Sequence, residues 1–157
     1  MRRGPPMQTN YNLLQKQLES LIEDETNLIT ILSNASALIN DNLDEVNWVG
    51  FYLVDNGELI LGPFQGHPAC MHIALGSGVC GTAASQDETQ VVQDVHQFPG
   101  HIACDANSQS EIVVPIHQHN EVIGVLDIDA PIKNRFDETD KQGLETVVAI
   151  LEAQLNH

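Results

Sequence analysis

Hydrophobic residues near the start of the chain recur every three or four positions, which is the spacing of one face of an α-helix. One such stripe contains Leu14, Leu18 and Leu21 with Ile22, and a second runs through residues 28–39. The polar Asp-Glu-Thr segment between the stripes breaks the pattern and offers acids and a hydroxyl that suit the start of the second helix. The pattern therefore predicts two amphipathic helices that pack against a core or a partner subunit.

Beyond residue 46 the hydrophobic residues form short runs rich in aromatic and β-branched side chains, which is typical of β-strands. Asp55, Asn56 and Gly57 separate the first two runs, and Asn-Gly is a strong signal for a tight hairpin turn. A second hairpin is expected to turn at residues 117–121. The predicted strands are residues 47–54, 58–61, 89–94, 111–116 and 122–129.

A glycine-rich turn at residues 76–81 (GSGVCG) leads into a short helix expected at residues 79–85. The turn matches the pattern GxGxxG. A dinucleotide-binding fingerprint, however, needs a preceding strand in a βαβ unit and an acidic residue about twenty positions further on. Here a hairpin precedes the turn and Asp94 comes too early, so we do not interpret this segment as a nucleotide site.

A final helix is predicted to begin in the acidic segment at residues 136–140 and to carry an apolar stripe through residues 144–155. The elements then follow the order helix, helix, hairpin, strand, short helix, strand, hairpin, helix. This order predicts an α+β fold with a central antiparallel β-sheet and helices packed against it.

The composition sets limits on the class of protein. The chain has 157 residues, 42% of them hydrophobic, and we expect a single domain at residues 8–157 with a disordered N-terminal extension at residues 1–7. The 22 Asp and Glu against six Lys and Arg give a formal charge of −16, which excludes nucleic acid and anionic membrane surfaces as expected partners. No apolar run reaches the ~20 residues of a membrane helix. Three cysteines without a CxxC pair fit a reducing compartment, so we expect a cytoplasmic protein.

Cys104 lies in a polar loop that opens at Pro99 and Gly100 and leads into the apolar strand beginning at Glu111. A thiol on a loop held by a rigid strand is a candidate for redox or nucleophilic chemistry. The alternative is a small buried residue, which is a common role for cysteine. Cys80 is similarly ambiguous, because the first turn of a helix favours a thiolate but close packing would explain a small residue equally well.

Acidic and aromatic residues share faces of the predicted strands. Asp127 and Asp129 are two positions apart and point to the same face, where they repel each other unless a cationic or proton-bearing group meets them. A solvent-facing strand is the alternative. Trp48 and Tyr52 likewise share a face on either side of Gly50 and leave room for a ligand, although core packing also explains such a pair.

A metal site is not expected. His117 and His119 lie on one side of an extended segment, but that segment is a predicted hairpin turn. The three cysteines do not show the spacing of zinc ligands.

Six motifs follow one another along the chain: NWVGFY (47–52), LGPFQG (61–66), GVCGTA (78–83), GHIACDA (100–106), SEIVVP (110–115) and IGVLDID (123–129). Together they resemble the free methionine-(R)-sulfoxide reductases, a family of stand-alone GAF domains. The resemblance covers nearly the whole chain after the N-terminal tail and includes all three cysteines of the family. It implies a GAF-like fold and the reduction of free L-methionine-(R)-sulfoxide to L-methionine.

The resemblance also implies roles for individual residues. Cys104 matches the cysteine that attacks the sulfoxide sulfur and becomes a sulfenic acid. Cys70 matches the cysteine that resolves this sulfenic acid as a disulfide, and Cys80 matches a third cysteine, which serves as an alternative or relay resolving cysteine. A thioredoxin system with NADPH would restore the thiols, no bound cofactor is expected, and a homodimer through the terminal helices is implied. The residues that match the substrate pocket are Trp48 and Tyr52 around the S-methyl group, the acids Glu111, Asp127 and Asp129, and the backbone N–H groups near Ile102, Ala103 and Cys104 for the carboxylate.

Elementary chemistry agrees with this assignment. A free amino acid is a zwitterion, so its pocket needs anions for the ammonium and donors for the carboxylate. Crowded carboxylates raise one another's pKa, and we expect Glu111, which of these three acids lies nearest Cys104 in the sequence, to donate a proton to the departing oxygen. The same acids disfavour a Cys104 thiolate, which His101, backbone dipoles or the substrate ammonium would have to offset.

Two other classes of function fit the residues. One is a GAF module that binds a small ligand without chemistry, and the other is a redox-sensing or structural protein whose cysteines report oxidation. Only the enzyme consumes added methionine sulfoxide, so measuring its consumption distinguishes the reductase from the other two classes.

Overall fold

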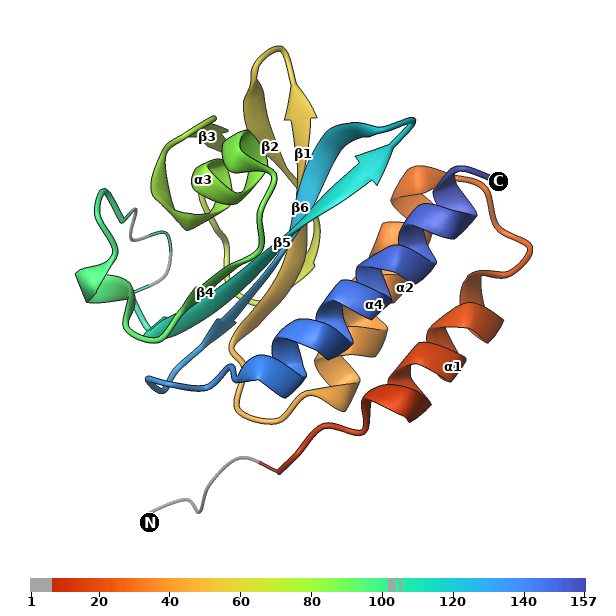
Figure 1. Cartoon of the computed structure of the whole chain (residues 1–157), viewed down its shortest axis with the longest axis horizontal. Helices are drawn as coiled ribbons and strands as arrows, with labels where there is room; N and C mark the ends of the chain where they lie inside the picture. Colours follow the sequence, from red (N-terminus) through yellow and green to blue (C-terminus); the bar gives the residue numbers. More distant parts are fainter. Residues whose placement is uncertain (1–6, 102–103, 105) are drawn as a thin grey trace.

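The computed structural model describes residues 7–101, 104 and 106–157. These residues form one antiparallel sheet of six strands, in the order β3-β2-β1-β6-β5-β4, and four α-helices (Figure 1). The helices are α1 (Tyr11–Ile22), α2 (Leu28–Asn42), α3 (Gly78–Gln86) and α4 (Glu138–Leu155), with a 3₁₀ helix at Val95–Gln97. The strands are β1 (Trp48–Asp55), β2 (Glu58–Gln65), β3 (His72–Ala74), β4 (Gln90–Val92), β5 (Ser110–Gln118) and β6 (Glu121–Ala130). The predicted α+β class and the antiparallel sheet are confirmed.

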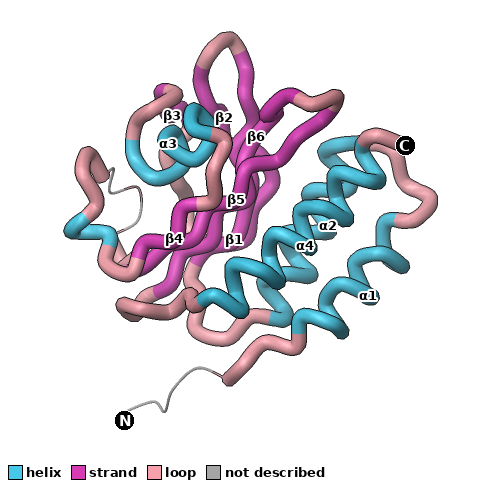
Figure 2. The backbone as a smooth tube through the Cα atoms, in the orientation of Figure 1, coloured by secondary structure: helices cyan, strands magenta, loops and turns pink. Residues whose placement is uncertain are grey.

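The two faces of the sheet carry separate hydrophobic cores, because successive residues of a strand point to opposite faces. On one face, α2 and α4 pack against the sheet and α1 packs against both helices (Figures 1 and 2). Alternate residues such as Ile112, Val114 and Leu126 fill the core on this side. On the other face α3 covers β5 and β6, and Val113 and Val125 belong to the core there. The site described below lies on the α3 face.

Side-chain caps begin the long helices where the sequence changes pattern. Asn10 and Asn27 accept hydrogen bonds from the backbone N–H groups three residues further on, and Asp137 forms a capping box with Asp140. Leu21 of the first predicted stripe is 45% exposed, because the buried face of α1 is formed by Tyr11, Leu14, Leu18 and Ile22 and leaves Leu21 at its edge.

Both predicted hairpins are present, with shifted limits. Strand β2 continues to Gln65 instead of ending at residue 61, because Pro63 falls in a bulge opposite β1, where no ladder hydrogen bond needs its missing N–H. The second turn is only His119 and Asn120, both with positive φ, so β5 extends through the segment expected to be part of the turn. The strand expected at residues 89–94 is confirmed in a shorter form, as β4.

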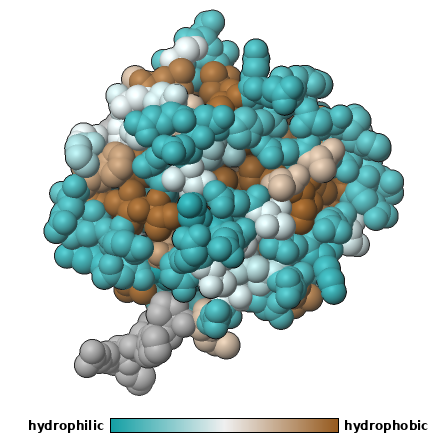
Figure 3. Space-filling model, in the orientation of Figure 1, coloured by the Kyte–Doolittle hydropathy of each residue, from teal (hydrophilic) through white to brown (hydrophobic). Residues whose placement is uncertain are grey.

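The surface is largely hydrophilic on the face seen in Figure 3, where hydrophobic residues form separate patches. None of the helices in the described residues is long and apolar enough to cross a membrane. Residues 1–6 of the expected N-terminal extension lie outside the described residues, and the backbone N–H of Met7 donates to Asp44 Oδ2 at 2.9 Å.

Candidate active site

Two adjacent strands place three carboxyl groups on the α3 face of the sheet. Glu111 on β5 is the register partner of Asp129 on β6, and Asp127 lies two residues before Asp129 on the same face. Glu111 and Asp127 are 7% and 5% exposed, whereas Asp129 is only half-buried. The solvent-facing alternative for the acidic pair is therefore wrong for Asp127.

The buried carboxyl groups favour their protonated forms. Burial raises the pKa of Glu111 well above its ordinary value, and the charges of Asp127 and Asp129 raise it further. Burial also raises the pKa of Asp127, while a hydrogen bond with Glu111 works in the opposite direction. We assign the proton to Glu111, because both neighbouring acids raise its pKa whereas hydrogen bonding partly lowers that of Asp127. The Oδ1 atom of Asp127 is buried and has no hydrogen-bond partner in the described part of the chain.

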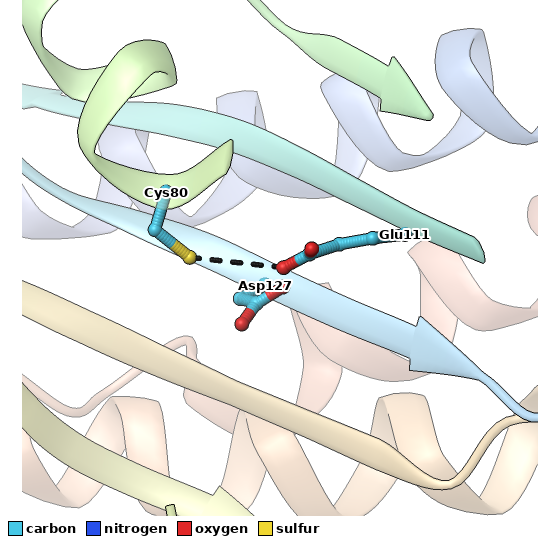
Figure 4. Close-up of side chains that lie close together, drawn as sticks. All are labelled: Cys80, Glu111 and Asp127. Atoms are coloured by element: carbon cyan, nitrogen blue, oxygen red, sulfur yellow. Dashed lines mark hydrogen bonds between the residues drawn. The ribbon is translucent and has the colours of Figure 1, made fainter. Parts of the chain in front are cut away.

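Cys80 approaches these acids from the first turn of α3, and Figure 4 shows its thiol pointing toward the Glu111 carboxyl group. The distance from Cys80 Sγ to Glu111 Oε2 is 3.9 Å. Burial, and then the charges of Asp127 and Glu111, raise the pKa of the Cys80 thiol well above its ordinary value. Burial and the nearby acids therefore oppose a Cys80 thiolate, which the position in the first turn of a helix had favoured.

Cys80, Glu111 and Asp127 also have the composition of a metal site, because one ligand atom of each lies within 4.8 Å of the others. Metal ions bind deprotonated ligands, so their affinity falls when the ligands hold protons. The raised pKa values of all three groups therefore favour protons over a metal ion.

Trp48 and Tyr52 form an aromatic wall beside the acids. Their rings stack with centroids 5.9 Å apart, and Trp48 also stacks on Phe64 of β2 at 5.1 Å. The expectation that Gly50 leaves room for a ligand is wrong, because the Trp48 ring and Phe64 Cβ occupy the space that a Gly50 side chain would take. The core-packing alternative is confirmed, since the rings belong to the hydrophobic core of this face, and the same rings also line the cavity.

The polar atoms of this wall bind the connection between β2 and β3. Trp48 Nε1 donates to the carbonyl oxygen of His67 at 3.1 Å. Tyr52 Oη donates to the carbonyl oxygen of Cys70 at 2.8 Å. Cys70 is joined to Cys104 by a disulfide bond, which is the pair implied by the resemblance.

A small cavity of about 40 Å³ is lined by Cys104 of this disulfide. The predicted residues that line it are Trp48, Tyr52, Cys80, Cys104, Glu111, Asp127 and Asp129. Of the other predicted site residues, Cys70 meets the cavity through its bond to Cys104, whereas Ile102 and Ala103 lie outside the described residues. His101 lines the cavity as well, but burial and nearby His96 lower its pKa, so it is a poor source of compensating positive charge.

Two serines of the cavity were not expected from the sequence. Ser77 precedes α3, and its side chain forms no capping hydrogen bond. Ser108 is 7% exposed, and its Oγ accepts a hydrogen bond from Asn47 Nδ2 at 3.3 Å. The glycine-rich turn before α3 was the one available signal for Ser77, because it brings the helix N-terminus to the site, whereas the position of Ser108 depends on the path of the loop.

Comparisons with known proteins agree with this geometry. The GAF domain family matches residues 27–155. Free methionine-R-sulfoxide reductase of Escherichia coli (strain K12) is 49% identical over 145 residues, which span 92% of this chain and 88% of that protein. This chain belongs to the GAF-domain family of free methionine-R-sulfoxide reductases.

Solved structures of the family superpose closely on this fold. The reduced form of fRMsr of Staphylococcus aureus is 67% identical, with a TM-score of 0.95 over 98% of this chain and 99% of that chain. The same protein in complex with substrate gives a TM-score of 0.93 at 67% identity, over 97% of this chain and 99% of that one.

Proposed function

We propose that this protein reduces free L-methionine-(R)-sulfoxide to L-methionine. The observation that carries the proposal is the Cys70–Cys104 disulfide, which lies at a cavity lined by three carboxyl groups and two aromatic rings. A redox-active cysteine pair needs such a cavity to bring a particular oxidant to one of its sulfurs. The names of the relatives in E. coli and S. aureus support the same substrate.

The cavity offers matched groups for a zwitterionic amino acid. Asp127 Oδ1, which is buried without a hydrogen-bond partner in the described residues, is suited to accept from the substrate ammonium together with Asp129. The Trp48 and Tyr52 rings provide an apolar surface for the S-methyl group. The substrate carboxylate is assigned to the backbone N–H groups of Ile102, Ala103 and Cys104.

The proposed reaction begins when the Cys104 sulfur attacks the sulfoxide sulfur while Glu111 gives its proton to the sulfoxide oxygen. Collapse of this adduct releases methionine and leaves Cys104 as a sulfenic acid, so that cysteine is oxidised by two electrons and the sulfoxide is reduced by two. The Cys70 thiol then attacks the sulfenic sulfur, which forms the Cys70–Cys104 disulfide and releases water. The substrate ammonium supplies the positive charge that offsets the acids around the Cys104 thiolate.

We assign the return of the disulfide to two thiols to thioredoxin, with NADPH as the source of electrons. Cys80 is proposed as the alternative resolving cysteine, although its buried thiol must first lose a proton to act as a nucleophile. A cytoplasmic location and a homodimer through the terminal helices remain predictions.

The proposal is tested by following NADPH consumption with thioredoxin and its reductase. Four sulfoxides are supplied separately: the R and S epimers of free methionine sulfoxide and the same epimers within a peptide. Turnover with the free R epimer alone is expected. No turnover with any of them, from a folded protein with three reduced thiols, would favour a ligand-binding GAF module instead.

A further inference from the structure

The segment that carries Cys70 is tied down mainly by the aromatic wall of the cavity. Residues 66–71, here called the Cys70 segment, connect β2 to β3. Within the described residues, one backbone hydrogen bond holds the segment, from Leu61 N to Met71 O at 3.0 Å. The two other hydrogen bonds come from Trp48 Nε1 to His67 and from Tyr52 Oη to Cys70. The remaining tie is the disulfide to Cys104.

We propose that Tyr52 and Trp48 are positioning residues that latch the Cys70 segment over the cavity and so hold Cys70 within reach of Cys104. The inference rests on the proposed function for its place in catalysis. The latch itself concerns only the thiol pair. The two aromatic residues proposed to contact the substrate therefore also determine how readily Cys70 reaches Cys104.

The Tyr52 donor is well suited to a latch. Burial raises the pKa of the Tyr52 hydroxyl well above its ordinary value, and the charge of Asp127 raises it further, so the hydroxyl keeps its proton at any working pH. Its acceptor is the backbone carbonyl of Cys70 itself, so the bond fixes the residue that carries the resolving sulfur. Tyr52 is only 2% exposed, and a hydrogen bond shielded from water is stronger than an exposed one.

The Trp48 contact requires a glycine at the start of the segment. Gly66 has φ of +140°, and an added Cβ would lie 2.5 Å from Trp48 Cδ1 and 3.0 Å from the Asn47 carbonyl oxygen. A side chain at this position would therefore push the segment away from the indole ring. The backbone of the segment passes close over the ring because residue 66 is glycine.

The small volume of the cavity requires that the Cys70 segment be held reversibly, so that it can open to admit substrate. About 40 Å³ is far below the ~300 Å³ at the lower end of small-molecule pockets, so the disulfide form leaves little room for an amino acid. Reduction of the disulfide breaks the covalent tie and leaves three hydrogen bonds, which the segment can exchange for water as it opens to substrate. When methionine has left, the latch restores the closed position in which Cys70 meets the Cys104 sulfenic acid.

The first test needs no sulfoxide and uses the full chain. The protein is equilibrated with mixtures of reduced and oxidised dithiothreitol, in which the Cys70–Cys104 disulfide takes two electrons and two protons from the dithiol and the dithiol becomes the cyclic disulfide. The fraction of disulfide is measured by alkylation and mass spectrometry. Tyr52→Phe removes only the hydroxyl and is expected to shift the equilibrium constant about three- to tenfold toward the protein dithiol, since the lost hydrogen bond is buried in the disulfide form and is exchanged for water in the open dithiol form.

Tyr11→Phe is the matched control. Tyr11 is the other tyrosine of the chain, is buried, and donates its hydroxyl hydrogen bond to Asp140 at 2.6 Å, between α1 and α4. Its loss affects stability without touching the Cys70 segment, so we expect the equilibrium of Tyr11→Phe to equal that of the unchanged protein. An unchanged equilibrium in Tyr52→Phe, or an equal shift in both variants, would overturn the latch.

The second test places the latch in the catalytic cycle. Reduced protein is mixed with the R sulfoxide in the presence of dimedone, which competes with Cys70 for the Cys104 sulfenic acid. We expect Tyr52→Phe to show a three- to tenfold larger ratio of trapped Cys104 to disulfide, and Trp48→Phe to change in the same direction. A ratio equal to that of the unchanged protein would contradict the proposal. If no sulfoxide is reduced by any form, the proposed function fails while the dithiothreitol result still decides the latch.

Discussion

Replacing Glu111 with Gln separates the proton-donor role from the shape of the site. Gln has almost the same size as Glu and can keep a contact with the Cys80 thiol, which lies 3.9 Å from Glu111 Oε2. It has no acidic proton to give to the sulfoxide oxygen. General acid catalysis by a positioned side chain typically contributes 10²- to 10⁴-fold, so we expect Glu111→Gln to lower the rate of methionine release by about 10²-fold or more.

The same substitution should raise stability at neutral pH. The pKa of Glu111 is raised in the folded protein, so the folded state binds the proton more tightly than the unfolded chain, whose glutamate pKa is about 4.3. Its contribution is complete below that value and is lost as the pH rises toward the folded pKa, at ~1.4 kcal/mol for each pH unit between the two pKa values. Glu111→Gln does not titrate, so its stability relative to the unchanged protein should increase between pH 4 and pH 7.

The assay pairs rapid-quench measurement of methionine release with urea unfolding at pH 4, 5.5 and 7. Asp129→Asn is the comparison variant, because Asp129 is an acid of the same cavity that is only half-buried. We expect it to weaken substrate binding more than it lowers the chemical rate. A Glu111→Gln protein that releases methionine at more than about a tenth of the normal rate would refute the assignment of Glu111 as the acid. A stability difference that does not change with pH would refute the raised pKa.

Three further predictions concern residues on both sides of the sheet. The side chain of His117 lies between two carboxylates, with Nδ1 2.6 Å from Glu152 and Nε2 2.6 Å from Asp87. Burial lowers the pKa of His117, but the hydrogen bonds to Glu152 and Asp87 outweigh burial and raise the pKa above its ordinary value. His117→Gln should therefore lose about 0.5–1 kcal/mol of unfolding free energy below pH ~6.5 and little above the raised pKa, as urea titrations across that range would show. Cys104→Ser should abolish methionine formation and keep the native circular dichroism spectrum, and residual turnover above a few per cent would exclude Cys104 as the nucleophile. Cys80→Ser should retain rapid disulfide formation in a thiol-counting assay, because the protonated Cys80 thiol is a weak competitor, and an accumulation of sulfenic acid would instead assign the resolving role to it.

The alternation of strand residues was enough to predict which side chains of one strand share a face. Trp48 and Tyr52 share one face of β1, and Asp127 and Asp129 share one face of β6. Bringing the two pairs together requires β1 to pair with β6 in the register that sets Gly50 opposite Asp127, which neither hairpin turn specifies, so the shared pocket was expected only from the resemblance.

Features that depend on tertiary burial could not be predicted in the same way. The position of Cys80 at a helix N-terminus suggested a thiolate, but the acids that raise its pKa come from strands more than thirty residues later in the sequence. The extension of β2 beyond the predicted residues 58–61 depends on a bulge that accommodates Pro63. The anchoring of the Cys70 segment by Tyr52 and Trp48 required the path of a loop, which hydrophobic patterning does not specify.

The central claim is that one sulfoxide is reduced at the expense of the Cys70 and Cys104 thiols. It is tested most directly by a single turnover without any reductant, in which fully reduced protein is mixed with excess free methionine-(R)-sulfoxide. We predict one methionine formed per chain, the loss of two thiols, and peptide mapping that finds Cys70 joined to Cys104 and Cys80 still free. No methionine, or methionine formed while Cys70 and Cys104 both remain reduced, would contradict the claim.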